Sequence, residues 1–196
     1  MEFPLMGQQV VVDLANTVWV YAGTRADALD SIEVADRWLI AVGNNVLGAG
    51  GTLLEAAGGT EALRVRDEEF RAALQQLRGH VRALLAAAGD WDVDPAALDA
   101  LNRAAAAAPS HLYAEPGAPG PTVARLRPQP VLTAVLSALA EDALVMMHID
   151  ATVLACPGPG CLGLFVQDDP RRRYCSSNCA NRARVARHYA RTRPEE

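Results

Sequence analysis

The sequence predicts an α+β protein in two parts: a helix-rich domain with a small sheet or hairpin over residues 1–150, and a compact module over residues 151–196. Three observations support this prediction. Apolar residues recur at helical spacing in several stretches, two short runs are typical of paired strands, and all four cysteines lie in the last quarter of the chain. With 51% hydrophobic and 21% charged residues among 196, the first part can build a sizeable core.

The clearest predicted helix covers residues 61–88. Its apolar residues are three and four positions apart, which places them along one buried stripe, while arginines and glutamates occupy the other face. The stripe consists of Phe70, Leu74, Leu77, Val81, Leu84 and Leu85.

Short elements are expected before this helix. Residues 10–12 are three valines, which predict a strand followed by a helical turn. Asp30 and Glu33 have the spacing of a capping box and predict the start of a short helix. Six glycines and two asparagines between residues 43 and 59 predict a loop.

After residue 90 the sequence predicts a helix, a hairpin and a second helix. Asp94 and Pro95 provide the N-cap and the first residue of a helix that continues through the alanine run. Residues 111–115 and 122–127 are strand candidates on either side of a turn rich in proline and glycine. Residues 131–147 are apolar nearly all round, which predicts a largely buried helix.

The four cysteines form two close pairs, Cys156-x₄-Cys161 and Cys175-x₃-Cys179, separated by 13 residues. This spacing is typical of a tetrahedral zinc site. The first pair flanks a Pro-Gly turn and the second lies at a predicted helix start, which is a treble-clef-like arrangement. Because four thiolates fill the coordination sphere, a single Zn²⁺ would be structural and would hold no catalytic water. We expect the last ~40 residues to depend on the metal and the first part to fold without it.

Disulfides are less expected than a metal. The first residues lack the basic start and apolar run of a signal peptide, and no segment reaches ~18 uninterrupted apolar residues. These features predict a cytoplasmic protein with no membrane partner, and thiols stay reduced in the cytoplasm. No nucleophile–base constellation and no phosphate-binding glycine loop is apparent, so we do not expect an enzyme.

Arginines gather around the cysteines. Residues 1–155 hold 10 arginines and 19 acidic residues, a balance of −9, whereas residues 156–196 hold 8 arginines and 4 acidic residues, a balance of +4. Over residues 156–193 the arginines and two aspartates give +6, and zinc with four thiolates adds −2, which leaves +4. That charge supports a few phosphate contacts and weak binding by a monomer, so we expect a homodimer that presents two modules.

A predicted helix over residues 177–191 carries most of these arginines. Arg184, Arg187 and Arg191 fall on one face of it, while Val185 and Tyr189 are expected to pack back onto the module. The candidate nucleic-acid contacts are Arg171, Arg172, Arg173, Arg182, Arg184, Arg187 and Arg191.

The chain also resembles a known family. The segments Arg173-Tyr-Cys-Ser-Ser-Asn-Cys179 and Cys179-Ala-Asn-Arg182 resemble the CGNR zinc finger, and Val11-Val-Asp-Leu-Ala-Asn-Thr17 is similar to the opening of the ABATE domain that usually precedes it. The resemblance implies a stress-induced transcriptional regulator whose finger binds DNA. Ala180 stands where the family has glycine; alanine favours the helix by roughly 1 kcal/mol, but any close approach that glycine allows is in doubt.

Several functions remain open at this stage. The module could bind DNA or RNA, could be a zinc-stabilised protein-interaction module, or could only stabilise the chain. DNA ranks above RNA mainly through the resemblance. RNA-binding modules commonly stack bases on aromatic side chains, and this module has few of them beyond Tyr174 and Tyr189. In the first domain, Asp13 and Asn16 could line the pocket of a small-molecule effector, although capping and turn roles also explain them.

Overall fold

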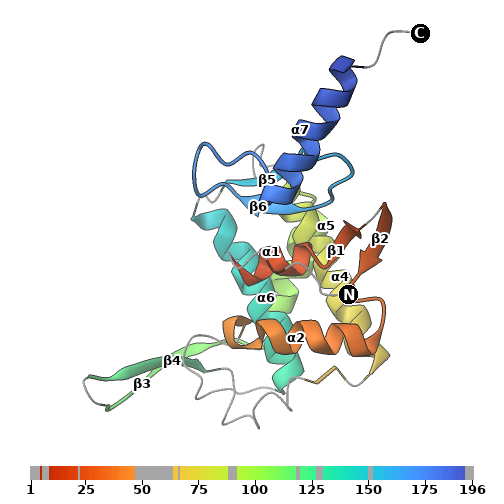
Figure 1. Cartoon of the computed structure of the whole chain (residues 1–196). Helices are drawn as coiled ribbons and strands as arrows, with labels where there is room; N and C mark the ends of the chain where they lie inside the picture. The colour runs from red at the N-terminus through yellow and green to blue at the C-terminus, as the bar shows by residue number, and fades with distance from the viewer. Residues whose placement is uncertain are drawn as a thin grey trace.

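The three-dimensional structure is a computed structural model, which describes residues 5, 9–21, 23–46, 64–65, 67–87, 92–117, 120–126, 130–149 and 152–192. The described chain is helix-rich with small antiparallel sheets, as predicted (Figure 1). Its helices are α1 (Val10–Ala15), α2 (Ile32–Val46), α4 (Glu68–Ala86), α5 (Pro95–Ala106), α6 (Val131–His148) and α7 (Ser177–Thr192). Its strands form three two-stranded hairpins: β1 (Val18–Tyr21) with β2 (Thr24–Asp27), β3 (His111–Glu115) with β4 (Thr122–Leu126), and β5 (Val153–Ala155) with β6 (Leu164–Val166).

The core lies between α4, α5 and α6, with α1 and α2 packed against α4 and α6. The predicted stripe of α4 is buried, from Phe70 to Leu85. Helix α6 has the length and the mean hydropathy, 1.5, of a membrane span, and is the one such candidate in the described part of the chain. It packs against α4 and α5, and its Val135 and Leu139 are fully buried. Core helices pass the same length and hydropathy test, so this is weak evidence for a span.

The strand predicted at residues 10–12 is wrong, because these valines form the first turns of α1. All six residues of α1 are buried, so the segment has no polar face from which a helical period could be recognised. A short apolar run of this kind fits a buried strand and a buried helix equally well, and packing against α4 and α6 decides between them.

Two other boundaries differ from the predictions. Ser31, not Asp30, caps α2: its Oγ accepts from the backbone N of Val34 at 3.3 Å, and the helix continues through Gly43 to Val46. The loop predicted from residue 43 therefore begins later, and residues 47–59 lie outside the described part.

Helix α4 begins after Asp67, whose side chain accepts from the backbone N of Phe70 at 2.7 Å. Residues 64–65 precede this cap and are not helical, so the start predicted at residue 61 is wrong at those two positions. Residues 61–63 are outside the described part, as are residue 88 and residue 127, the predicted ends of this helix and of the second strand.

A buried ion pair fastens the β1–β2 hairpin to α4. Arg78 on α4 bonds both carboxylate oxygens of Asp27, and its guanidinium also donates to Thr17 Oγ1 at 3.0 Å. The side chains of Arg78 and Asp27 are each only 10% exposed. This hairpin, which the sequence did not predict, forms one wall of the junction with the C-terminal module.

The C-terminal module shares the core of the helices. Val153 of β5 and Leu164 of β6 are buried within the same hydrophobic cluster as α1, α4 and α6. Asn16, at the end of α1, pairs with the backbone of Leu164: its Nδ2 donates to the carbonyl and its Oδ1 accepts from the amide, both at 2.8 Å. The domain boundary at residue 150 stays a prediction, because buried residues are common to both parts.

Candidate metal centre

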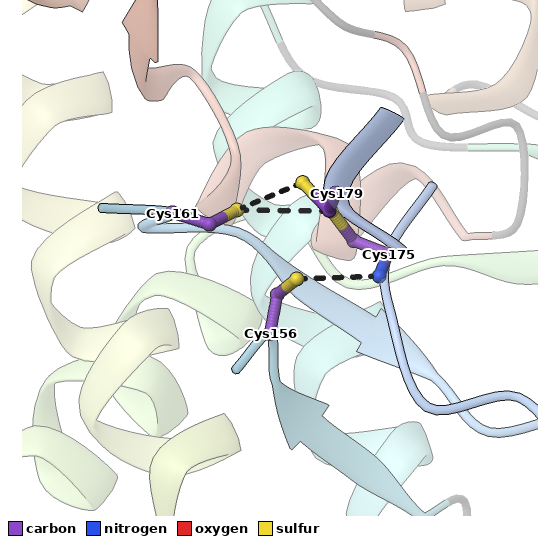
Figure 2. A group of neighbouring side chains, drawn as sticks. All are labelled: Cys156, Cys161, Cys175 and Cys179. Carbon is purple, nitrogen blue, oxygen red and sulfur yellow. Dashed lines mark hydrogen bonds between the residues drawn. The ribbon is translucent and has the colours of Figure 1, made fainter. Parts of the chain in front are cut away.

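Two segments bring the four cysteines together (Figure 2). Cys156 and Cys161 flank the loop that joins β5 to β6, while Cys175 and Cys179 lie at the start of α7. The loop is a tight knuckle: the Cys161 amide donates to the Gly158 carbonyl at 2.9 Å, and the Cys156 amide donates to the Gly163 carbonyl at 2.8 Å. This knuckle places one pair of sulfurs beside Cys175, which precedes α7, and Cys179 in its first turn.

The sulfur separations fit a tetrahedral metal. Cys161 Sγ lies 3.7 Å from Cys175 Sγ and 3.7 Å from Cys179 Sγ, and the last two sulfurs are 3.4 Å apart. All four sulfurs lie within 4.8 Å of one another. A disulfide needs about 2.05 Å, whereas a zinc–sulfur bond of ~2.3 Å gives a tetrahedral edge of ~3.8 Å. The cluster therefore fits one structural zinc ion held by Cys156, Cys161, Cys175 and Cys179.

Two glycines allow this close approach. A Cβ added at Gly158 would lie 3.1 Å from the Cβ of Cys179, and one added at Gly163 would lie 3.3 Å from Cys161 Sγ. Gly160, between the first two cysteines, has a φ of +67°, a conformation that favours glycine. The knuckle therefore needs glycine for both space and backbone conformation.

Hydrogen-bond donors surround the sulfurs. The Gly163 amide donates to Cys161 Sγ at 3.3 Å, the Cys175 amide donates to Cys156 Sγ at 3.4 Å, and Arg182 Nη2 donates to Cys179 Sγ at 3.0 Å. Zinc with four thiolates carries a charge of −2, and these donors stabilise that charge.

The thiols ionise unequally in the metal-free cluster. Burial raises the pKa of Cys175 and of Cys161. Burial also acts to raise the pKa of Cys179, but hydrogen bonds from Ser176, Arg182 and the neighbouring thiols outweigh it and lower the pKa to about 7. Zinc must displace the thiol protons, so its apparent affinity rises with pH.

Helix α7 is anchored only at its first turns. Ser176 caps it, because its Oγ accepts from the Cys179 amide at 3.3 Å. The buried residues of α7 are Cys179 and Ala183, and the helix then extends away from the body (Figure 1). Val185 is 43% exposed and Tyr189 is 68% exposed, so the packing predicted for them is wrong.

The structure divides the seven candidate arginines into two groups. Arg172 and Arg182 have partners inside the module: Arg172 bonds the Asp168 carboxylate and the Cys175 carbonyl and lies 5.4 Å from the Phe165 ring centre, while Arg182 bonds Cys179. Arg182 is itself exposed, as are the other five, of which Arg184 donates to Asn181 Oδ1 at 2.7 Å. The second group consists of Arg171, Arg173, Arg184, Arg187 and Arg191.

Only one of the two candidate effector residues, Asp13 and Asn16, lines a cleft beside the metal centre. Asn16 lines this cleft in addition to pairing with Leu164. Asp13 is 4% exposed within α1 and does not line that cleft.

Sequence reasoning missed residues that join the two parts. Arg82 on α4 donates to the carbonyls of Ala15 and Leu162 and so links α1 to the knuckle. Nothing local in the sequence distinguishes Arg82 from Arg71 and Arg78, the other arginines of the same helix. Gly158 could have been noticed, since a Pro-Gly-Pro-Gly run between two ligands indicates a crowded turn.

The fold and the four-thiolate centre together define a zinc-finger protein. The ABATE family model, described as "Putative stress-induced transcription regulator", matches residues 8–148, and the CGNR zinc finger model matches residues 153–192. The chain therefore belongs to the ABATE family and contains a CGNR zinc finger. Among curated proteins no match was found.

Proposed function

We propose that this regulator binds DNA through its zinc finger, with the exposed arginines of α7 on the phosphates. The observation that carries the proposal is the outer part of α7: residues 184–192 are exposed on every side, and Arg184, Arg187 and Arg191 are spaced to share one face. Zinc fixes the first turn of this helix, so the arginines are presented from a rigid base.

The exposed turns need a partner. A helical segment of nine residues without tertiary packing is marginally stable in water. A polyanion would stabilise it by pairing with the three arginines. Arg171 and Arg173 border a cleft of about 450 Å³ next to the start of α7 and could extend the same contact. Arg172 and Arg182 instead make hydrogen bonds within the module.

The remaining parts of the proposal concern the whole protein. The modest charge of the module favours a homodimer, in which two fingers contact one duplex. The exposed Leu112 and Val123 of the β3–β4 hairpin offer an apolar surface for that dimer.

We propose a cytoplasmic binding protein whose first domain senses a small molecule. A four-thiolate zinc shell has no open position for a catalytic water, so we do not assign an enzymatic activity.

A protein-interaction module is the second candidate. The exposed Val185 and Tyr189, four residues apart on α7, favour it because they could insert into an apolar groove of a partner. RNA binding is a third outcome of the same experiment, since phosphate contacts do not distinguish the two nucleic acids.

The test is a fluorescence-anisotropy titration of a labelled DNA duplex of random sequence. We expect the Arg184/Arg187/Arg191→Ala variant to bind at least about tenfold more weakly than wild type, because phosphate contacts supply most non-specific affinity. The matched control is Arg25/Arg37/Arg103→Ala, which removes the same charge from exposed positions of the first domain. The control should bind like wild type.

Equal affinity for wild type and the α7 variant would contradict the DNA proposal and favour the protein-interaction module. Equal affinity of both triple variants, each weaker than wild type, would show that only net charge matters. A labelled RNA duplex in the same titration distinguishes the nucleic acids, and zinc content should remain at one per chain in every variant.

A further inference from the structure

A second cleft lies where the first domain meets the zinc finger. Its volume is about 580 Å³, and it is formed by the end of α1, strand β1, the knuckle loop and the first turns of α7. Sites for small molecules commonly have volumes of about 300–1,000 Å³ and lie at domain junctions. The cleft thus has the size and the place of a small-molecule site, and it borders both family regions.

The two walls of the cleft differ in chemistry. The first is apolar and comes from Trp19, Val20 and Leu162, and the half-buried indole of Trp19 offers an aromatic surface. The second is polar and comes from Asn178, Asn181 and Arg182 on α7. A ligand that fills the cleft must therefore have a flat apolar body and a polar edge.

The polar wall offers donors from Arg182 and Asn181. Arg182 uses one N–H on Cys179, and a guanidinium carries five N–H groups. The side-chain oxygen of Asn181 already accepts from Arg184, so the amide nitrogen is the group left to donate into the cleft. An acceptor on the polar edge of a ligand, such as a carbonyl oxygen, can bond to both of these donors.

Local charge disfavours an anion. The charged groups that line the cleft itself are zinc with its thiolates, at −2, and Arg182, at +1, which sum to −1. Arg184 and Arg82 contact the lining residues Asn181 and Leu162 but do not line the cleft. Cys161, Cys175 and Cys179 all line the cleft, which places this charge at its wall. A carboxylate or phosphate placed against the sulfurs would be repelled, whereas a neutral carbonyl would not.

We propose that this cleft binds a small, neutral aromatic compound that carries a carbonyl oxygen. The ring lies against Trp19 and Leu162, and the oxygen accepts from Arg182 and Asn181. Such a ligand contacts β1 of the first domain and the start of α7 at once. It therefore couples the first domain to the presentation of the arginines, and this last step rests on the proposed DNA binding.

Coumarin is a suitable probe, because it is a neutral bicyclic aromatic compound with a ring carbonyl. The experiment follows backbone amide signals of the zinc-loaded full chain by NMR during titration. We expect saturable shifts at Val18, Val20, Leu162 and Asn178, with a Kd of about 1 mM or tighter. Chroman lacks the carbonyl and should bind about tenfold more weakly, and coumarin-3-carboxylate adds a negative charge and should also bind more weakly.

Two variants locate the site. Leu162→Trp should fill the cleft and abolish the coumarin shifts while zinc content stays at one per chain; Val20→Trp fills it from the other element and serves if the first variant fails to bind zinc. Tyr189→Leu, at the exposed end of α7 outside the cleft, should leave the Kd of coumarin unchanged.

No saturable shift from any of the three probes, or coumarin binding that survives both filling variants, would overturn the proposal. Tightest binding by the carboxylate would overturn the assignment of a neutral ligand.

The DNA step is tested separately by repeating the anisotropy titration with saturating coumarin. A change in DNA affinity must be matched by an equal change in coumarin affinity when DNA is present. Coumarin binding in a protein that does not bind DNA would support the site and contradict the proposed function. DNA binding with no coumarin shifts would support the proposed function and contradict the site.

Discussion

At the scale of single residues, the metal centre depends on groups that are not ligands. Gly158 and Gly163 set how closely the knuckle approaches the sulfurs, and Arg182 donates to Cys179. Groups around a zinc site typically change metal affinity by about 10- to 100-fold when mutated. The geometry therefore makes these residues testable through zinc binding.

The first prediction concerns Gly158. Gly158→Ala should weaken zinc binding by roughly tenfold, because its new Cβ would lie 3.1 Å from the Cβ of Cys179 and must push α7 away. Competition with a zinc-binding indicator dye measures the change. Gly79→Ala is the control: nothing lies within 4 Å of its added Cβ, and alanine should stabilise the helix by about 1 kcal/mol. Unchanged zinc affinity in Gly158→Ala would show that the knuckle can move without affecting the metal.

The cysteines were predictable from sequence, whereas the roles of individual arginines were not. Close cysteine pairs have few structural explanations, so their spacing alone predicted the ligands. Arg172 and Arg173 are adjacent and chemically identical in the sequence. Only the folded positions of Phe165 and Asp168 assign Arg172 to the interior contacts of the module.

At the scale of elements, the β1–β2 hairpin depends on one ion pair with α4. Arg78→Met should destabilise the protein by about 3–5 kcal/mol, because it leaves the buried carboxylate of Asp27 without its partner. Urea unfolding followed by circular dichroism measures the loss. The double variant Arg78→Met/Asp27→Asn removes the orphaned charge and should recover part of the stability. Equal stability of the single and double variants would show that the charge is not the cause.

The elements also show where sequence patterns succeed. Helix α4 was predictable because its apolar stripe alternates with charged residues, and α5 because Asp94 and Pro95 mark its start; Asp94 does accept from the Ala96 amide. Helix α1 was not, because burial on all sides removes the periodic signal. The outer half of α7 was predicted as a helix but not as an unpacked one, since Val185 and Tyr189 have the spacing of a packed face.

At the scale of the whole molecule, the finger and the first domain share buried contacts. From the sequence we expected the first part to fold without the metal. Val153, Leu164 and the Asn16 hydrogen bonds instead place the β5–β6 hairpin within the common core. The long-range pairing of Asn16 with Leu164, 148 residues apart, has no local signature in the sequence.

Removal of zinc should therefore weaken both parts. We expect chelation to lower the stability of the first domain by about 3 kcal/mol, because exposing residues such as Val153 and Leu164 costs about 1.5–3 kcal/mol each. Thermal unfolding monitored by NMR of the methyl groups of Leu139, which is buried in α6, measures this effect. An unchanged melting temperature at Leu139 would show that the two parts are independent. Asn16→Ala should reproduce part of the loss with zinc still bound.

The central claim is that zinc presents the arginines of α7 to DNA. The most direct measurement is the slope of log Kd against log salt concentration for wild type and for Arg184/Arg187/Arg191→Ala. Each lost phosphate contact should reduce the slope by roughly 0.9, so the variant should lose up to about 2.7, while Arg25/Arg37/Arg103→Ala keeps the wild-type slope. Identical slopes for wild type and the α7 variant would contradict the account.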